Sequence, residues 1–158
     1  MLFRSTSWAS DYEALLPRSS AAPPAHEVVE SDWHSIYFTS GTTGKPKGIV
    51  LSQRNWLAVV RNHLVDTYAK SDTTDVLLHA APMSHATGSL TFAHMARGVP
   101  QTFLKRFDPA ATLDKFERDG ITTIWLAPTM WSKMVELMDV KSRNLSGLRS
   151  IRFGGAPI

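Results

Sequence analysis

Cysteine is absent from the 158 residues, which excludes disulfide bridges, zinc fingers, iron–sulfur clusters and a thiol nucleophile but leaves the redox compartment open. An excess of one charge is also absent, because 17 Lys and Arg residues face 14 Asp and Glu residues and the net charge is only +3. No basic block of the kind that coats phosphate backbones occurs, and no basic stretch is interleaved with aromatic residues. We therefore expect an anionic small molecule as partner, and no nucleic acid.

A long apolar run is missing as well. Val76 to Ala96 carries no charged residue and has about the length of a membrane span, but its histidines, hydroxyl residues and proline are too polar for lipid. The first residues lack the apolar stretch of a secretory signal, and Asp11 and Glu13 argue against a mitochondrial presequence. These absences predict a cytoplasmic protein with no membrane span.

What the sequence does contain is an alternation of strand-like and helix-like segments. Hydrophobic residues make up 43% and charged residues 20%, which is ordinary for one globular domain. β-Branched and aromatic runs predict strands at 35–39, 49–51, 76–78, 102–104, 122–126 and 150–153. Apolar spacing, capping residues and prolines predict helices at 11–16, 53–69, 84–95, 109–119 and 128–138. This alternation predicts an α/β fold with a mostly parallel sheet and flanking helices.

Particular residues mark helix ends and a linker. Ser10, Ser52 and Asp108 are predicted N-caps, and Gly120 is a predicted helix stop. Pro17 to Ala25 is rich in proline and small residues, which cannot build an apolar face. We therefore divide the chain into an N-terminal segment with a proline-rich linker, 1–32, and a partial domain, 33–158.

The segment richest in chemistry runs from Thr39 to Gly48 and reads TSGTTGKPKG. Its glycines allow positive φ and close backbone approach, so that several amide hydrogens can converge on one anion. Hydroxyl groups add hydrogen-bond donors, two lysines add positive charge, and the proline between them stiffens the turn. These features predict a polyphosphate cradle made of Thr39, Ser40, Gly41, Thr42, Thr43, Gly44, Lys45, Pro46 and Lys47.

Two other interpretations of this segment carry less weight. It is not a Walker loop, because Lys45 is followed by proline instead of the serine or threonine that opens a helix. A hairpin rich in glycine and threonine, between Phe38 and Ile49, would explain an isolated GTTG. The whole string, with its two lysines and four hydroxyl groups, favours phosphate binding.

The longer string YFTSGTTGKPKGIVLSQRN, from Tyr37 to Asn55, resembles the phosphate-loop signature of the adenylate-forming superfamily. That superfamily includes acyl-CoA synthetases, luciferases and the adenylation domains of peptide synthetases. APMSHATG, from Ala81 to Gly88, resembles the substrate-pocket segment of fatty- and aryl-acyl CoA ligases. RFGGAP, from Arg152 to Pro157, resembles the strand and turn that pack beside adenine. The resemblance covers about residues 33–158, and its three motifs occur in the expected order.

The resemblance implies roles for individual residues. Residues 39–47 would contact the β- and γ-phosphates of ATP, with Lys47 at the superfamily's lysine and Lys45 at a variable position. His85 would lie beside the acyl chain or carboxylate, so Lys47 and His85 are the implied catalytic residues. The adenine side would be formed by Gly154, Gly155, Ala156 and Pro157.

The resemblance also implies the reaction of an AMP-forming acid–CoA ligase. A carboxylic acid attacks the α-phosphorus of ATP, pyrophosphate leaves, and coenzyme A takes the acyl group from the acyl-adenylate. Mg²⁺ would accompany ATP, and none of the matched residues is implied as a metal ligand. Cationic and amide donors would stabilise the charge that builds on the leaving group. The matched motifs set neither the acid nor the oligomeric state.

Parts of the superfamily pattern are missing from the chain. Gln53 stands where a histidine is frequent. The tyrosine–glycine–threonine–glutamate segment, the ribose-binding aspartate and the C-terminal domain with its catalytic lysine would all follow Ile158. We therefore interpret the chain as a partial N-terminal domain of an adenylate-forming enzyme, and we expect its 158 residues alone to be inactive.

An amino-acid adenylation domain and a non-catalytic ATP-binding fragment are the alternatives. The first is disfavoured because no acidic residue that could bind an ammonium group lies between Asp75 and Asp108. The histidines lack the spacing of metal ligands on one helix turn, so no metal site is expected. Trp125 and Trp131 either line an acyl tunnel or pack in the core. A basic cluster is interpreted as solvated surface: Lys141, Arg143, Arg149 and Arg152.

Overall fold

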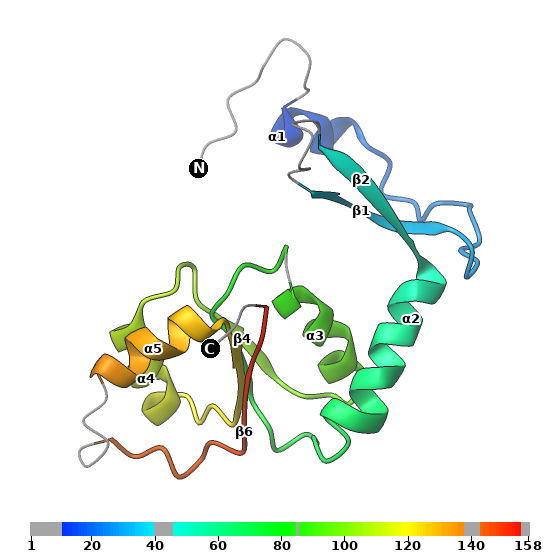
Figure 1. Cartoon of the computed structure of the whole chain (residues 1–158). Coiled ribbons are helices and arrows are strands. Elements are labelled where there is room, and N and C mark those ends of the chain that lie inside the picture. The colour runs from blue at the N-terminus through cyan, green and yellow to red at the C-terminus, as the bar shows by residue number, and fades with distance from the viewer. Residues whose placement is uncertain (1–10, 40–45, 85, 138–142, 156–158) are drawn as a thin grey trace.

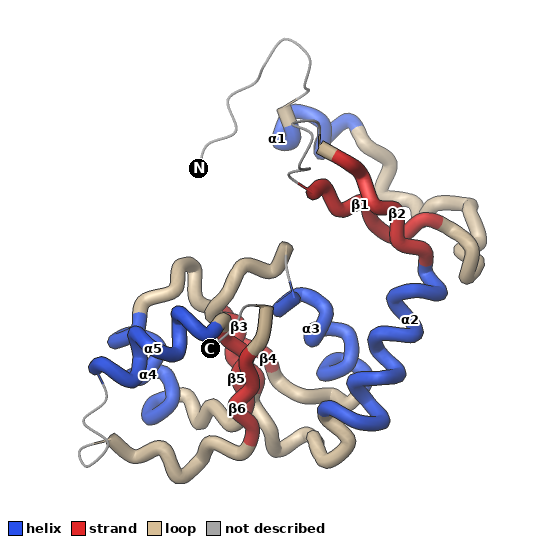
Figure 2. The backbone as a smooth tube through the Cα atoms, viewed as in Figure 1, coloured by secondary structure: helices blue, strands red, loops and turns tan. Residues whose placement is uncertain are grey.

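The computed structural model describes residues 11–39, 46–84, 86–137 and 143–155 (Figure 1). These residues form two β-sheets, a two-stranded antiparallel hairpin and a four-stranded parallel sheet. A long helix connects the two, so that the hairpin stands above the layered part of the chain (Figure 2). The candidate site residues are divided between these two structures.

The hairpin pairs β1 (Trp33–Thr39) with β2 (Lys47–Ser52). It follows a one-turn helix, α1 (Tyr12–Leu15), and a 3₁₀ turn, η1 (Leu16–Arg18). Both predicted strands are confirmed, and each is somewhat longer than predicted. The hairpin lies outside the parallel sheet, a separation that the strand pattern alone did not indicate.

Helix α2 (Gln53–Asn62) begins directly after the hairpin. Ser52 and Asn55 form a capping box in which each side chain accepts the other's backbone N–H, so the predicted N-cap is confirmed. The expected continuation to residue 69 is wrong, because the helix widens into a π-helical turn, η2 (His63–Thr67). The N–H of Tyr68 closes this turn on a carbonyl 2.7 Å away, and only 4% of Tyr68 is exposed.

The parallel sheet has the strand order β4–β3–β5–β6. Its strands are β3 (Leu77–His79), β4 (Gln101–Phe103), β5 (Thr123–Leu126) and β6 (Ser150–Phe153). The helices that connect them are α3 (Ala86–Ala96), α4 (Pro109–Arg118) and α5 (Pro128–Leu137). Helices α4 and α5 cover one face, whereas α3 and the end of α2 lie on the other (Figure 1). The predicted α/β fold with a parallel sheet and flanking helices is confirmed.

The core is divided in two by the sheet, because successive side chains of a strand point to opposite faces. Leu78, Ile124 and Leu126 belong to a cluster under α4 and α5 and are fully buried. Leu77 belongs to a second, smaller cluster under α3, against which Trp125 packs. The second face therefore holds fewer apolar side chains, and polar groups lie buried among them.

Two of the remaining predicted helix signals are confirmed and one is wrong. Asp108 caps α4, since its Oδ1 accepts the N–H of Ala111 at 2.8 Å. Gly120 follows α4 with φ of 61°, a conformation that favours glycine. Asp11 and not Ser10 caps α1, because the Asp11 carboxylate accepts the N–H of Glu13 at 2.9 Å.

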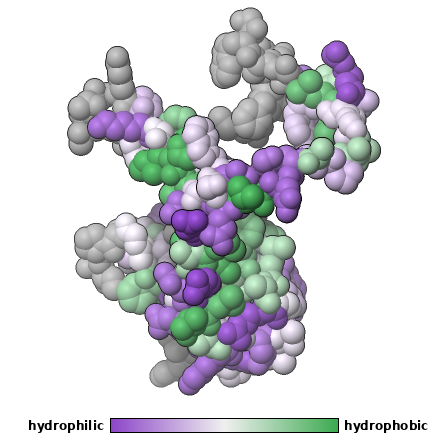
Figure 3. Space-filling model, turned by 90° about the vertical axis from the view of Figure 1, so that its right-hand side faces the viewer, coloured by the Kyte–Doolittle hydropathy of each residue, from purple (hydrophilic) through white to green (hydrophobic). Residues whose placement is uncertain are grey.

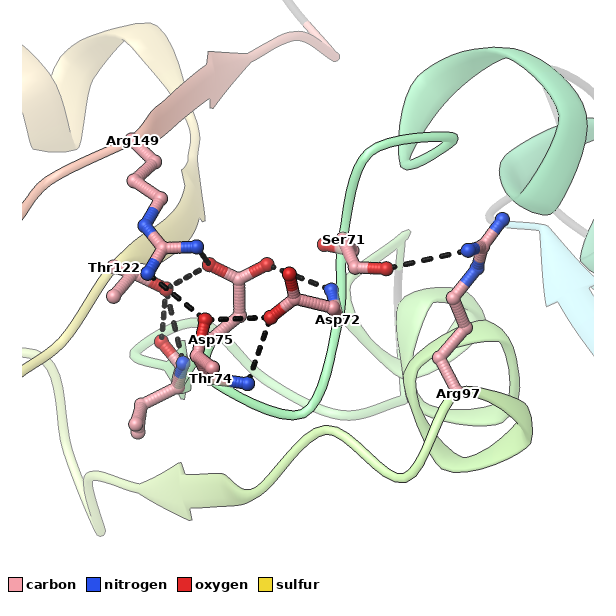
Figure 4. A network of polar contacts seen from close by, with 8 residues as sticks. Ser71, Asp72, Thr74, Asp75, Arg97, Thr122 and Arg149 are labelled. Carbon is pink, nitrogen blue, oxygen red and sulfur yellow. Dashed lines mark hydrogen bonds and ion pairs between the residues drawn. The ribbon is translucent and has the colours of Figure 1, made fainter.

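Buried polar groups join the amino ends of the parallel strands (Figure 4). Asp75 precedes β3 and is only 3% exposed. Its Oδ1 accepts the hydroxyl of Thr122 at 2.8 Å and lies 3.2 Å from Nη1 of Arg149. Thr122 Oγ1 in turn accepts the N–H of Val76 at 2.9 Å. Thr122 thus connects the segment before β5 to the segment before β3 through both of its hydrogen-bonding functions.

Replacing Thr122 by valine is expected to lower the free energy of unfolding by about 2 kcal/mol, because a buried carboxylate and a backbone N–H each lose a partner. Valine has nearly the shape of threonine, so the change removes hydrogen bonds without opening a cavity. Urea unfolding monitored by circular dichroism measures the change. Thr74→Val is the matched control: its hydroxyl accepts from Arg149 and donates to Asp72, both at exposed positions, and a change under about 0.5 kcal/mol is expected. Equal losses in the two variants would contradict the role given to Thr122.

The basic cluster near the C-terminal end is solvated surface only in part, and the interpretation is corrected for Arg143 and Arg152. Nη1 of Arg143 lies 2.6 Å from Oδ1 of Asp114 on α4. Arg152 is half-buried against η2, whereas Arg149 is exposed and pairs with the buried Asp75. Lys141 lies outside the described residues. Spacing alone did not separate these arginines from surface charges, because their partners lie far away in the sequence.

Apolar and hydrophilic side chains alternate over the surface, both on the layered part of the chain and on the part that stands above it (Figure 3). None of the helices in the described ranges is long and apolar enough to cross a bilayer.

Candidate functional site

The predicted phosphate cradle joins the two strands of the hairpin. Thr39 and Lys47 are register partners at its open end, so the ends of the predicted segment lie opposite each other. Pro46 and Lys47 are exposed, and no ion pair of the described residues includes Lys47. Ser40, Gly41, Thr42, Thr43, Gly44 and Lys45 lie outside the described residues. The hairpin interpretation thus fits the local geometry, while phosphate binding by this loop stays a prediction.

One glycine of the motif has a packing role. A Cβ atom at Gly48 would lie 3.1 Å from Cγ2 of Ile36 and 3.4 Å from Cε1 of Phe38, which are side chains of the opposite strand. Glycine at position 48 therefore allows the side chains of Ile36 and Phe38 on β1 to pack closely over the backbone of β2.

The second motif lies where β3 passes into α3. Ala81 to Ser84 follow the strand, and α3 begins at Ala86. A Cβ atom on Gly88 would lie only 2.1 Å from the backbone oxygen of Met83, so the first turn of α3 packs directly on this loop. His85 lies outside the described residues, and its proposed role rests on its position in the chain between Ser84 and α3.

The third motif lies at the carboxyl end of β6. Gly155 has φ of 87°, which strongly favours glycine, and Trp125, at 3.9 Å, is the only described residue that a Cβ atom there would meet within 4 Å. A Cβ atom on Gly154 would lie 3.8 Å from the same indole. The turn therefore lies against the Trp125 ring, with room for a ligand to approach its backbone. Ala156 and Pro157 lie outside the described residues.

A cavity of 430 Å³ lies between the hairpin, α2 and α3, and we call it the hairpin cavity. Its lining is mostly apolar: Tyr37, Leu51, Asn55, Trp56, Val59, Ser84 and Ser89. Trp56 on α2 contacts the other two walls of the cavity. Its Nε1 donates to Oγ of Ser35 on β1 at 3.0 Å, and its ring packs edge-on against Phe92 on α3, with centroids 5.4 Å apart. Ser84 in the lining connects this cavity to the second motif.

A second cavity of 440 Å³ lies on the α3 face of the sheet, and we call it the sheet cavity. It is lined by residues of η2, α3, β5 and β6: His63, Thr67, Tyr68, Ser89, Leu90, Trp125, Ile151, Arg152 and Phe153. Trp125 lines this cavity and packs against the second core cluster, so its core interpretation is confirmed, while the lining of an acyl tunnel stays a prediction. Trp131 lies on the other face of the sheet, in the cluster under α4 and α5.

Polar groups without partners lie buried around the sheet cavity. The hydroxyl of Tyr68 and Nδ1 of His63 are buried and make no hydrogen bond within the described residues. Burial raises the pKa of Tyr68 to about 12, so the hydroxyl keeps its proton at neutral pH. Burial, with the nearby charge of Arg152, lowers the pKa of His63. Tyr68 and His63 therefore lie beside the guanidinium of Arg152 in the lining, with the Tyr68 hydroxyl and Nδ1 of His63 themselves covered by protein.

Stability should fall in mild acid because histidines are buried without charge. Burial lowers the pKa of both His79 and His94, each only 1% exposed. The unfolded chain therefore binds more protons than the folded chain as pH drops below about 6.5. The free energy of unfolding should fall there, with a limiting slope of about 1.4 kcal/mol per pH unit for each histidine. Urea unfolding between pH 7.5 and 5.5 measures this, and His94→Gln should flatten the dependence; an unchanged slope would contradict it.

Three residues around the sheet cavity were not recognised from the sequence as members of a site. Tyr68 was placed only within the helix predicted at 53–69, and His63 carried no motif. Arg152 was placed both in a basic surface cluster and at the start of the third motif, but it was given no role of its own. The signal that was overlooked is that an inward-facing position of the third motif's strand holds a cation. The described residues hold no group of three or more histidine and acidic side chains suited to a metal ion.

The parallel strands define the class of the protein first. In such α/β domains, ligands bind beyond the carboxyl ends of the strands, and the second and third motifs follow β3 and β6 at that edge. The Thr39–Lys47 end of the hairpin lies on the same side of the molecule (Figure 1). A family model described as AMP-binding enzyme matches residues 3–158. The chain belongs to this family of AMP-binding enzymes.

Relatives of known activity are CoA ligases. The chain is 34% identical over 138 residues to a feruloyl-CoA synthase of Amycolatopsis sp, with 86% of this chain and 28% of the relative covered. It is 37% identical over 152 residues to an indoleacetate–CoA ligase of Aromatoleum aromaticum, with 93% of this chain and 29% of the relative covered. The chain thus spans little more than a quarter of the length of these relatives.

Solved structures of similar fold include a CoA synthetase. The N-terminal domain of FACL13 from Mycobacterium tuberculosis superposes with a TM-score of 0.75 at 25% identity, covering 92% of this chain and 36% of that one. An o-succinylbenzoate CoA synthetase from Bacillus subtilis, in complex with ATP and magnesium ion, gives a TM-score of 0.75 at 25% identity, covering 92% and 30%. These likenesses agree with an N-terminal domain of an adenylate-forming enzyme.

Proposed function

We propose that the chain is the phosphate-loop part, residues 33–158, of a longer AMP-forming acid–CoA ligase, preceded by the segment 1–32. One observation carries the proposal: motifs far apart in the sequence lie on one side of the molecule, at or above the carboxyl edge of the parallel sheet (Figure 1). The ligase relatives support the same activity. The reaction would join a carboxylic acid to coenzyme A at the expense of ATP.

The hairpin supplies the proposed phosphate-binding end. Lys47 is exposed and has no carboxylate partner among the described residues, so its charge is available to a phosphate. Thr39 stands opposite to Lys47 and adds a hydroxyl donor. The residues between them, 40–45, would contribute amide hydrogens to the β- and γ-phosphates. Mg²⁺ would enter bound to ATP, because the described residues supply no ready group of metal ligands.

The turn after β6 supplies the proposed adenine side. Among the described residues, Cβ positions on Gly154 and Gly155 meet nothing closer than the Trp125 ring, at 3.8 Å and 3.9 Å, and a flat base would approach the turn on this side. The acid would lie between this turn and α3, with His85 near the reacting carboxylate. The carboxylate oxygen would attack the α-phosphorus and release pyrophosphate; the sulfur of coenzyme A would then attack the acyl carbon and release AMP.

Two measurements test the proposal. Purified chain should bind MgATP weakly, and inorganic pyrophosphate should compete, because the loop alone holds the leaving phosphates. The longer polypeptide that continues the reading frame beyond Ile158 should release pyrophosphate and AMP when it is given MgATP, coenzyme A and an aryl or fatty acid. A chain that binds no MgATP, or a longer polypeptide that releases no pyrophosphate with any acid, would contradict the proposal.

A further inference from the structure

Helix α2 carries the hairpin that ends in the proposed phosphate loop. The helix starts directly after β2, and its carboxyl end, η2, lies against α3 (Figure 1). The direction of α2 therefore determines where the Thr39–Lys47 end of the hairpin lies relative to the turn after β6. Helix and hairpin extend over roughly 15 Å and roughly 20 Å, so a tilt of about 3° at η2 would displace the loop by about 1–2 Å.

Arg97 holds the carboxyl end of this helix. It directly follows α3, and its Nη2 donates to the backbone oxygen of Leu64 in η2 at 3.0 Å. Its Nη1 donates to the backbone oxygen of Ser71 at 3.3 Å (Figure 4). Carbonyls at the end of a helix lack N–H partners further along it, and a cation there suits the negative end of the helix dipole. The planar guanidinium therefore connects η2 and the segment after it to α3 with a defined geometry.

Arg152 holds the same helix end from the sheet. Its Nη2 donates to the backbone oxygen of Thr67 in η2, and its guanidinium lies 5.0 Å from the centroid of the Tyr68 ring. The Tyr68 ring also packs edge-on against His94 of α3, with centroids 4.4 Å apart. The carboxyl end of η2 is thus held by directional contacts from two elements, the end of α3 and β6.

The start of α2 is held by contacts of a different kind. The Trp56 ring lies 5.4 Å from that of Phe92 on α3 and 4.9 Å from that of His34 on β1, measured between centroids. Phe92 is 40% exposed. Apolar contacts are non-directional, so partly exposed rings can slide over each other, whereas a hydrogen bond weakens steeply when its angle changes. The direction of α2 therefore depends on the arginines at its carboxyl end.

We propose that Arg97 is a positioning residue, which sets the place of the hairpin relative to the turn after β6 by holding the carboxyl end of η2. Arg152 contributes to the same contact, but it belongs to the third motif, so its replacement would also disturb the proposed adenine side. Arg97 lies outside the three motifs, and its replacement isolates the effect of position. This inference rests on the proposed ligase function, in which ATP contacts both the hairpin loop and the turn.

Spin-label distances report the position of the hairpin without any ligand. The chain has no cysteine, so Ile49→Cys in β2 and Lys133→Cys in α5, both at exposed positions, provide two defined labels. Pulsed electron paramagnetic resonance measures the distribution of the distance between them. Arg97→Gln should shift or broaden this distribution by about 2 Å or more. Arg61→Gln is the matched control, because it removes an exposed arginine from the last turn of α2 and should leave the distribution unchanged.

Two ligands separate a change of position from a loss of folding. MgATP would contact both the loop and the turn after β6, whereas inorganic pyrophosphate would contact the loop alone. In titration calorimetry, Arg97→Gln should lower the affinity for MgATP about 3- to 10-fold, because the competent orientation is less populated, and change the pyrophosphate affinity less than about 2-fold. A variant that had only lost stability would bind both ligands more weakly. Arg97→Lys keeps the charge and one hydrogen bond, so its MgATP affinity should lie between those of the parent and Arg97→Gln.

The outcomes are distinct. An unchanged distance distribution in Arg97→Gln, or equal losses of affinity for MgATP and pyrophosphate, would overturn the inference. An equally large effect of Arg61→Gln would also overturn it, since any cation near the helix end would then suffice. If the parent chain binds MgATP and the distribution does not change, the ligase proposal stands without the inference. If the distribution changes in a chain that binds no MgATP, the result supports the role of Arg97 in placing the hairpin and contradicts the ligase proposal.

Discussion

Lys47→Ala is expected to slow adenylate formation by about 30- to 1000-fold in the longer polypeptide, which corresponds to about 2–4 kcal/mol of transition-state stabilisation. Lys47 lies in β2 opposite to Thr39, so the backbone that carries its side chain is ordered by strand pairing. Its side chain is exposed and has no carboxylate partner among the described residues. Alanine keeps the strand but removes the charge that would stabilise the departing pyrophosphate. ATP–pyrophosphate exchange measures the loss.

Lys45→Ala provides the matched comparison. Both variants remove one lysine from the same motif, and only Lys47 occupies the position of the superfamily's lysine. The loss should therefore be clearly smaller for Lys45→Ala, and the thermal unfolding of both variants should match that of the parent protein. Equal losses in the exchange assay would contradict the assignment of Lys47.

The arrangement of strands and helices was predictable because each element carries a local signal. Asp108 and Pro109 mark the start of α4, and Gly120 marks its end with positive φ. Strand β6 was predicted at its observed bounds from its β-branched and aromatic residues. The π-helical turn at 63–67 was not predictable, because its widening depends on where Tyr68 packs and the helical spacing of apolar residues continues through it.

The candidate site was predictable only as far as its motifs reach. The motifs at 39–48, 81–88 and 152–157 identified the candidate binding loops, because close approach of the backbone to an anion or a base requires glycines at fixed positions. The sheet cavity was not predictable, since it forms where η2, α3 and β6 meet in space. Arg152 and Tyr68 are 84 residues apart in the sequence. Taken alone, Arg152 is explained as a surface charge and Tyr68 as an aromatic residue of the core.

The close packing of α3 on the preceding loop determines how the second motif is held. The Cβ position on Gly88 lies 2.1 Å from the oxygen of Met83, 3.2 Å from its carbonyl carbon and 3.8 Å from its Cα. All three neighbours are backbone atoms, so no flexible side chain can move aside. The loop that carries Ser84 and the start of α3 therefore keep their mutual position only when residue 88 is glycine.

Gly88→Ala is expected to lower the free energy of unfolding by about 3 kcal/mol or more, because a methyl group would overlap the backbone of Met83. The loop or the helix must shift by about 1 Å, and a shift of that size between reacting groups can cost about 100-fold in rate. Urea unfolding and ATP–pyrophosphate exchange measure the two effects. Gly147→Ala is the matched control. Among the described residues, its Cβ would meet nothing closer than the oxygen of Ile121 at 3.9 Å, so the free energy of unfolding should change by less than about 0.5 kcal/mol. A Gly88→Ala protein as stable and active as the parent would show that the loop and helix can separate without loss, and that their contact does not position the second motif.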